Sequence, residues 1–362
     1  MKLLNILVIT KIPGWSYWWP ALLISGLCML FQGCTNDNSS TLDVAENTIE
    51  IEKPSGNLVI YSGRGETLIG PIIQQFGDAT GINVSVKYAS TAELATTLQE
   101  EGNRTPADVF FAQDPGGLGA VEEMFETLPN HITGLVPEWA RSSDNRWVGI
   151  SGRARTVVYN PENIAVDELP NDMWGFVDPK WKSRIGWAPT NASFQTMVTA
   201  MRATWGNDKT RDWIEGIKAN KPTIYPKNTP QVAAVATGEI DVGFVNHYYL
   251  FRFLSEEGDS FPARNYHPRS GGPGSVVMVA GAGILSASKN QDNGQRFLEF
   301  MLSKVSQQYF AGQTFEYPLV EGVKTNRLLV PFSEIDQPNI SSKELADIRG
   351  TVDLLRETGV LP

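Results

Sequence analysis

The chain has 362 residues, with 40 acidic and 30 basic side chains and a formal net charge of −10. This length allows two ordinary domains, each with a sizeable core. The acidic balance argues against nucleic acid as a partner, because such binding needs a basic patch that displaces counterions.

The first 34 residues differ from the rest of the chain. Lys2 and Lys11 are their only charged residues, residues 18–30 are largely apolar, and a glycine precedes Cys34. This pattern resembles a lipoprotein signal peptide over residues 1–33, with cleavage before Cys34 and a lipid on its thiol. An uncleaved membrane anchor is the alternative, and it would change the mode of attachment but not the location outside the cytoplasm.

Processing at Cys34 would remove two lysines and leave a net charge of 28 − 40 = −12. It would also leave no thiol free to pair, so we expect neither a disulfide nor a thiolate metal site. Residues 34–56 are polar and lack a periodic apolar face, which is typical of a flexible tether.

From residue 57 onward, apolar strand patterns alternate with helical ones. The expected elements are a strand at 57–61, a helix carrying apolar residues from 68 to 76, a strand at 84–88, a helix at 91–101, a buried strand at 107–111 and a helix from about 118. This alternation predicts an α/β fold with a mostly parallel sheet and helices on both faces.

A second α/β set follows a less regular stretch. It comprises two strands at 147–150 and 156–159 joined through 151–155, a strand at 184–189, a helix through 203 with Thr190 or Asn191 as its N-cap, a helix at 208–219, a helix capped by 226–230, a strand at 276–286, one helix with an apolar stripe from 297 to 305, and a polar tail from about 333 with one or two surface helices. The two strands around 151–155 are placed as a crossing between lobes would be.

The stretch 241–252 is the most informative part of this set. Its apolar run from Val242 to Val245 predicts a buried strand, and the aromatic segment after it predicts a helix start. Tyr248 and Tyr249 therefore lie at the carboxyl end of a strand, where open α/β sheets bind ligands. Oxygen donors of this kind suit a hard cation. The alternative is an ordinary helix start with one core tyrosine and one half-exposed tyrosine.

Several segments together, in order from about residue 57 to 325, resemble one known family. They are 60–64, 106–111, 151–159, 189–194, 225–228, 246–249, 281–283 and 316–319. The set resembles the bacterial periplasmic ferric-ion-binding proteins, which are the substrate-binding proteins of iron(III) ABC importers. The resemblance implies the bilobal type II periplasmic-binding-protein fold, with two α/β lobes joined by a hinge. Lobe one would comprise 57–153 plus 279–330, and lobe two 154–278 plus 331–362.

The resemblance also implies a function and its residues. Tyr248 and Tyr249 would bind Fe3+ as phenolates, and a synergistic anion, carbonate or phosphate, would bind with the metal. The positions that match the anion-holding residues of the family are Asn191, Ala192, Ser193, Asn228 and Asn246. A helix N-terminus offers free amide groups and a favourable dipole to an anion. The alternative is a capped helix with ordinary turn asparagines.

Two positions depart from the family pattern. Some members have a His and a Glu ligand where this chain has Gly65 and Gln113. We hypothesise that a second carbonate fills the open positions, held by Ser62 and Arg64. Arg153 or Arg155 would add charge balance, because guanidinium groups match flat oxyanions. Ordinary interlobe salt bridges are the alternative for these arginines.

The resemblance implies further an extracytoplasmic receptor, in the periplasm or at the cell surface, that delivers iron to an inner-membrane ABC permease and its ATPase. We expect a monomer held to the membrane by its lipid. A receptor of the same fold for an oxyanion or phosphonate, a polyamine or thiamine is the alternative. We do not expect an enzyme, because the chain has no GxSxG, P-loop, metalloprotease motif or catalytic cysteine.

Overall fold

The computed structural model of the chain describes residues 55–362. The predicted signal peptide, the predicted lipidation site Cys34 and most of the predicted tether lie outside the described residues. Within residues 55–362, every helix is too short or too polar to cross a membrane.

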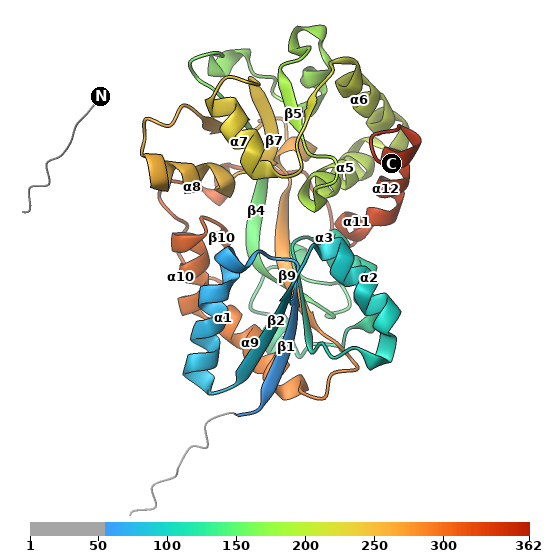
Figure 1. Cartoon of the computed structure of the whole chain (residues 1–362), viewed down its shortest axis with the longest axis vertical. Helices are drawn as coiled ribbons and strands as arrows, with labels where there is room; N and C mark the ends of the chain where they lie inside the picture. Colours follow the sequence, from blue (N-terminus) through green and yellow to red (C-terminus); the bar gives the residue numbers. More distant parts are fainter. Residues whose placement is uncertain (1–54) are drawn as a thin grey trace, which may run out of the picture. The chain divides into compact units, whose positions relative to one another are not determined.

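One lobe, at the bottom of Figure 1, is built from the first βα units. Its elements are β1 (Asn57–Ser62), α1 (Glu66–Thr80), β2 (Asn83–Tyr88), α2 (Thr91–Glu101), β3 (Val109–Ala112), α3 (Pro115–Ala120) and the short α4 (Asn130–Thr133). Strand β1 pairs in parallel with β2 and with β3, as the alternating pattern predicts. Helix α3 starts three residues before the predicted position, because Pro115 suits a first helical position and the Asp114 carboxylate accepts a hydrogen bond from the Gly117 amide.

The other lobe repeats the α/β arrangement. Its elements are β5 (Ile185–Trp187), α5 (Ala192–Trp205), α6 (Asn207–Ala219), β6 (Thr223–Ile224), α7 (Asn228–Ala236), β7 (Val242–Asn246), α8 (Tyr248–Glu257) and β8 (Arg264–Tyr266). Strand β5 pairs in parallel with β6 and β7. The strand and helix start predicted within 241–252 are both present, and so is the N-cap at Asn191.

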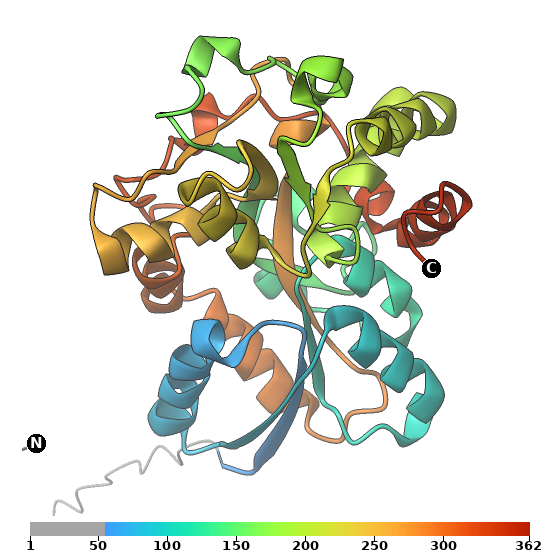
Figure 2. The same ribbon diagram turned by 45° about the horizontal axis from the view of Figure 1, so that its top comes forward.

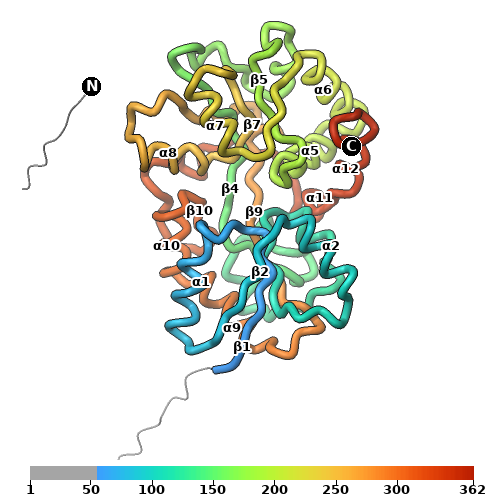
Figure 3. The backbone as a smooth tube through the Cα atoms, in the orientation of Figure 1, coloured from blue at the N-terminus to red at the C-terminus, as the bar shows by residue number. Residues whose placement is uncertain are grey.

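Two long strands, β4 (Val148–Tyr159) and β9 (Val277–Ile284), run through both lobes (Figures 1 and 3). The prediction of two separate strands within 147–159 is wrong, because β4 is continuous. Its first part pairs with β9 and its last part with β7 and β8, all antiparallel. Ser151, Arg153 and Arg155 therefore lie within a strand and not in a connecting turn.

The strand order across the sheet is β2-β1-β3-β9-β4-β7-β5-β6, and the short β10 (Tyr317–Pro318) pairs with β4. The predicted parallel pairing holds at the two ends of the sheet, whereas its centre is antiparallel. Each lobe has its own apolar core. Aromatic members of the first core include Phe76, Phe110, Phe125 and Phe297, and those of the second include Trp181, Trp213, Phe176 and Phe244.

After β9 the chain returns to the first lobe as α9 (Gln291–Met301) and α10 (Lys304–Gln313). The prediction of one helix with an apolar stripe through Val305 is wrong. Ser303 separates two helices, since its side chain accepts a hydrogen bond from the Ser306 amide and caps α10. Val305 is 55% exposed and belongs to no core.

The predicted tail helices are present as α11 (Ser342–Ala346) and α12 (Ile348–Glu357). They lie beside both α3 and α5, and so contact both lobes (Figures 1 and 2). Leu354 and Leu355 enter the second core. On the α3 side the packing is close, because a Cβ built on Gly119 would lie 2.5 Å from the Ala346 Cβ and 2.9 Å from the Ala346 carbonyl oxygen.

Substituting Gly119→Ala is therefore expected to lower the free energy of unfolding by about 1–2 kcal/mol, the usual cost of forcing a methyl group into a packed contact. The neighbouring backbone cannot move away as a flexible side chain would. Gly312→Ala in α10 is the matched control, since nothing lies within 4 Å of its added Cβ. Urea unfolding would measure both variants, and equal stabilities would contradict the close contact.

Candidate metal and anion site

The two tyrosines lie side by side at the carboxyl end of β7. Tyr248 is fully buried, and its ring stacks on that of Tyr249 with centroids 4.3 Å apart and an interplanar angle of 27°. Burial, and then the neighbouring Tyr248, raise the pKa of Tyr249 above its ordinary value of 10.0, while Asn228 and Arg64 act in the opposite direction. Two phenol oxygens are thus held together in a site where a cation would favour their deprotonated form.

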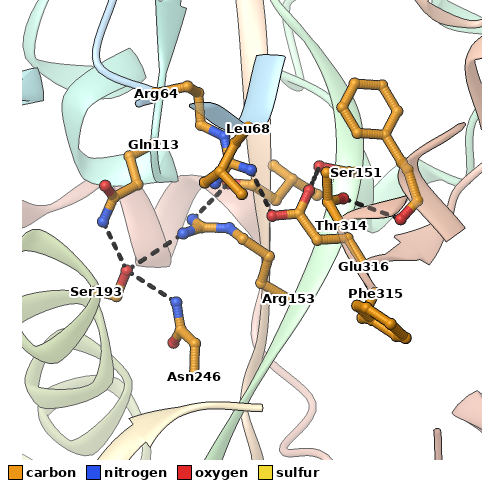
Figure 4. A network of polar contacts seen from close by, with 12 residues as sticks. Arg64, Leu68, Gln113, Ser151, Arg153, Ser193, Asn246, Thr314, Phe315 and Glu316 are labelled. Carbon is orange, nitrogen blue, oxygen red and sulfur yellow. Dashed lines mark hydrogen bonds and ion pairs between the residues drawn. The ribbon is translucent and has the colours of Figure 1, made fainter. Parts of the chain in front are cut away.

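A cluster of hydrogen-bond donors surrounds Ser193 in the first turn of α5 (Figure 4). The Ser193 hydroxyl oxygen lies 3.0 Å from Gln113 Nε2, 3.3 Å from Arg153 Nη1 and 3.2 Å from Asn246 Nδ2. Gln113 belongs to the first lobe, so one of these hydrogen bonds joins the two lobes. A hydroxyl oxygen has two lone pairs. The three donors therefore exceed what it accepts, and together they suit an oxyanion.

The asparagines extend this donor cluster. The Asn191 side chain accepts a hydrogen bond of 3.1 Å from the Ser193 amide and lies 3.5 Å from Asn228 Nδ2. Asn228 is fully buried at the start of α7, and its Oδ1 has no partner. Ala192 is the first residue of α5 and offers its backbone amide alone.

Arg153 and Arg155 project from β4 and are fully buried. Arg155 Nη1 donates to Asn246 Oδ1 at 3.0 Å, but its Nε and Nη2, and the Nε of Arg153, have no partner. Burial, and then the charge of Arg153, lower the pKa of Arg155 to about 9. Buried cations with unused donors are costly unless an anion compensates them. The positive charge of these two buried guanidinium groups therefore favours binding of an anion at the site.

Arg64 lies in the turn after β1 and is near the ring of Tyr248. It is buried, ion-paired with Glu316, and its guanidinium carbon is 6.0 Å from the centroid of the Tyr248 ring. The Ser62 hydroxyl donates to the Arg64 carbonyl at 3.0 Å and accepts from the Arg64 amide at 3.1 Å. Gly65 is exposed and is the N-cap residue of α1.

His247 is available neither as a ligand nor as a cation. Its Nδ1 lies 3.1 Å from the Ala154 amide and its Nε2 2.8 Å from the Phe315 carbonyl oxygen. Burial, followed by the neighbouring His267, lowers the pKa of His247 to about 3. In residues 55–362 there is no cluster of three or more His, Cys, Asp or Glu residues that could hold a metal. A metal at this candidate site would therefore depend on the phenols and on an added anion.

Sequence reasoning missed two residues of the site, Glu316 and Ser151. Both are fully buried, and Ser151 donates a hydrogen bond of 2.6 Å to Glu316 Oε2. The available signal was a single carboxylate in the otherwise apolar segment 315–319. A charged side chain is rarely fully buried without a partner, so this residue marked a buried ion pair, although its partner was not predictable from spacing.

Comparison with known proteins first gives the class. Residues 61–308 match the family model described as bacterial extracellular solute-binding protein. The chain therefore belongs to the bacterial extracellular solute-binding proteins.

Curated relatives and solved structures narrow the family. The chain is 32% identical over 316 residues to the major ferric iron-binding protein of Neisseria meningitidis, covering 84% of this chain and 93% of the relative. It is 31% identical to the Fe(3+)-binding periplasmic protein of Serratia marcescens, covering 84% and 90%. Iron-bound HitA from Pseudomonas aeruginosa is 31% identical with a TM-score of 0.81, covering 84% of this chain and 99% of that one. The chain is a member of the ferric-ion-binding protein family, which confirms the predicted family and its bilobal fold.

Proposed function

We propose that this chain is an extracytoplasmic receptor that captures ferric iron with a synergistic anion, carbonate or phosphate, and delivers it to an ABC permease and its ATPase. The observation that carries the proposal is the stacked pair Tyr248 and Tyr249 beside a cluster of unused donors and buried arginines. Phenolate oxygens select a hard, highly charged cation. The names of the curated relatives support the same cargo.

In the proposed binding mode, both lobes contribute residues to the site. Tyr248 and Tyr249 bind the metal, and the start of α5 with Asn228 and Asn246 binds the anion. Arg153 and Arg155 balance the added negative charge, which is why their spare donors support the proposal. The other lobe supplies Gln113, whose hydrogen bond to Ser193 is of the kind that a hinge closure would make. Ser62 and Arg64 are the proposed holders of a second carbonate.

The proposed boundaries of the lobes are 57–153 plus 279–330 and 154–278 plus 331–362. We further propose a monomer that is anchored to a membrane through a lipid on Cys34, after removal of residues 1–33, with 34–56 as its tether. The periplasmic location of a named relative supports a site of action outside the cytoplasm. A binding role without turnover fits this assignment.

A ligand panel tests the cargo. Ferric nitrilotriacetate with bicarbonate is expected to raise the melting temperature of the metal-stripped protein by on the order of 10 °C at a thousandfold excess over Kd, because a ligand that binds the native state alone stabilises it. Methylphosphonate, spermidine and thiamine are expected to leave the melting temperature unchanged. Stabilisation by one of these three without iron would favour the alternative receptor on the same fold.

A further inference from the structure

Glu316 is a fully buried carboxylate that nothing in the binding mode above uses. Its two oxygens have separate partners. Oε1 is ion-paired with Arg64, and Oε2 accepts the 2.6 Å hydrogen bond from the Ser151 hydroxyl. Both partners come from other elements, since Arg64 follows β1 and Ser151 lies within β4. The carboxylate is therefore fixed on both sides.

The backbone conformation of the preceding residue, Phe315, orients the Glu316 side chain. Phe315 has a φ of 55°, a left-handed conformation that is unfavourable for a bulky residue. Its ring stacks on Phe251 with centroids 5.3 Å apart, and Tyr317 pairs with Gly152 of β4. This packing holds the strained turn in place. Such strain persists where the surroundings fix a particular side chain, here the Glu316 carboxylate.

Arg64 lies between this carboxylate and the tyrosine pair. Its guanidinium carbon is 6.0 Å from the Tyr248 ring centroid, and its Nε is buried without a partner. Figure 4 shows the Arg64 guanidinium beside that of Arg153, with Glu316 on one side and the donor cluster around Ser193 on the other. Arg64 could thus pair with either of two negative groups, the Glu316 carboxylate or an anion bound at the candidate site.

The three buried arginines, Arg64, Arg153 and Arg155, differ in whether a carboxylate neutralises their charge. Arg64 is ion-paired with the Glu316 carboxylate, whereas within residues 55–362 Arg153 and Arg155 donate only to neutral groups, namely Ser193, Val279 and Asn246. A buried guanidinium whose charge is already matched attracts a further anion weakly, and removing its partner leaves a buried cation that binds an anion more strongly.

We propose, on the basis of the proposed function, that Glu316 tunes the affinity of the site for the anion. By pairing with Arg64 it competes with an oxyanion for that guanidinium, and so sets the bicarbonate concentration that ferric loading requires. Glu316 acts through Arg64 and does not touch the metal. Ser151 supports it by fixing its second oxygen.

The test measures ferric loading of the metal-stripped full-length chain from ferric nitrilotriacetate over a series of bicarbonate concentrations, followed by the visible phenolate-to-iron band. The Glu316→Gln variant keeps the shape of the side chain and removes its charge. Its half-saturating bicarbonate concentration is expected to be lower than that of the unchanged protein by roughly tenfold, as expected when one charge-assisted partner of Arg64 is lost. Glu321→Gln, an equal charge change at an exposed position, is expected to leave that concentration unchanged.

A double-mutant cycle separates this role from a general structural one. In an Arg64→Met background, Glu316→Gln is expected to have no further effect on the bicarbonate requirement, because Glu316 acts through the missing guanidinium. An equal effect in both backgrounds would overturn the proposal. Ser151→Ala, which keeps both charges, is expected to shift the requirement in the same direction by less.

These experiments distinguish a failure of the proposed iron-binding function from a failure of the proposed role of Glu316. If the unchanged protein gives no band at any bicarbonate concentration, the proposed function fails. If it loads iron normally and Glu316→Gln requires the same bicarbonate, the role of Glu316 alone fails. Should Glu316→Gln not fold, as judged by thermal unfolding, the Ser151→Ala variant decides, and an unchanged requirement there overturns the role of Glu316.

Discussion

Replacing Tyr248 and Tyr249 together by phenylalanine is expected to abolish the visible iron band and to weaken ferric binding by more than roughly 100-fold. Changing a residue that merely supports a metal ligand typically costs 10- to 100-fold in affinity, and this change removes two ligands. The protein should still fold, because phenylalanine keeps the stacked rings, whose centroids are 4.3 Å apart. Competition against a chelator of known ferric affinity would measure the loss.

Tyr88→Phe provides the control for this experiment. Tyr88 is a half-buried tyrosine of β2, far along the sheet from β7. Its substitution removes a phenol of the same kind and is expected to leave both the band and the affinity unchanged. A band that persists in the double variant, with the intensity of the unchanged protein, would show that other groups bind the iron.

Ferric affinity is expected to fall steeply as the pH falls. Burial and Tyr248 raise the pKa of Tyr249, so in the metal-free protein this phenol keeps its proton at every pH below the raised value. Iron binding must displace that proton, and each proton displaced makes the affinity change by about tenfold per pH unit. The two phenol ligands should therefore contribute a drop of about 100-fold for each unit of acidification, and bicarbonate that binds as carbonate would add its own proton to this slope.

The slope can be measured by chelator competition between pH 6 and 8, with bicarbonate held at saturation and the proton affinities of the chelator taken into account. The single variant Tyr248→Phe has one phenol fewer to deprotonate and should show about tenfold per unit. An affinity that does not change over this range would contradict binding by phenolates.

The elements with local signals were predictable from the sequence. The apolar run of β7, the helix start at Tyr248 and the N-cap at Asn191 each depend on a few neighbouring residues, and the structure contains all three. These signals are sufficient to place the tyrosine pair at a strand end and Asn191 at a helix start. The βα alternation of each lobe followed in the same way from apolar periodicity.

Two of the features that local patterns did not predict depend on residues far away in the sequence, and a third depends on a single local cap. Strand β4 is continuous because β9 and β7 pair with its two parts, and its polar residues 151–155 hid this continuity. Arg64 and Glu316 are 252 positions apart, and no spacing rule joins them. The division between α9 and α10 rests on one capping serine within an apolar pattern that continued through it. Local patterns therefore predict the tyrosine pair at the end of β7 but not the buried charges around it.

The most direct test of the central claim is a visible absorption titration of the metal-stripped protein with ferric ion, with and without bicarbonate. We expect a coloured phenolate-to-iron charge-transfer band that saturates at one iron per chain and requires the anion. A saturating band without bicarbonate or phosphate would contradict the synergistic anion. No band under any condition would contradict the tyrosine site itself and favour an oxyanion or polyamine receptor.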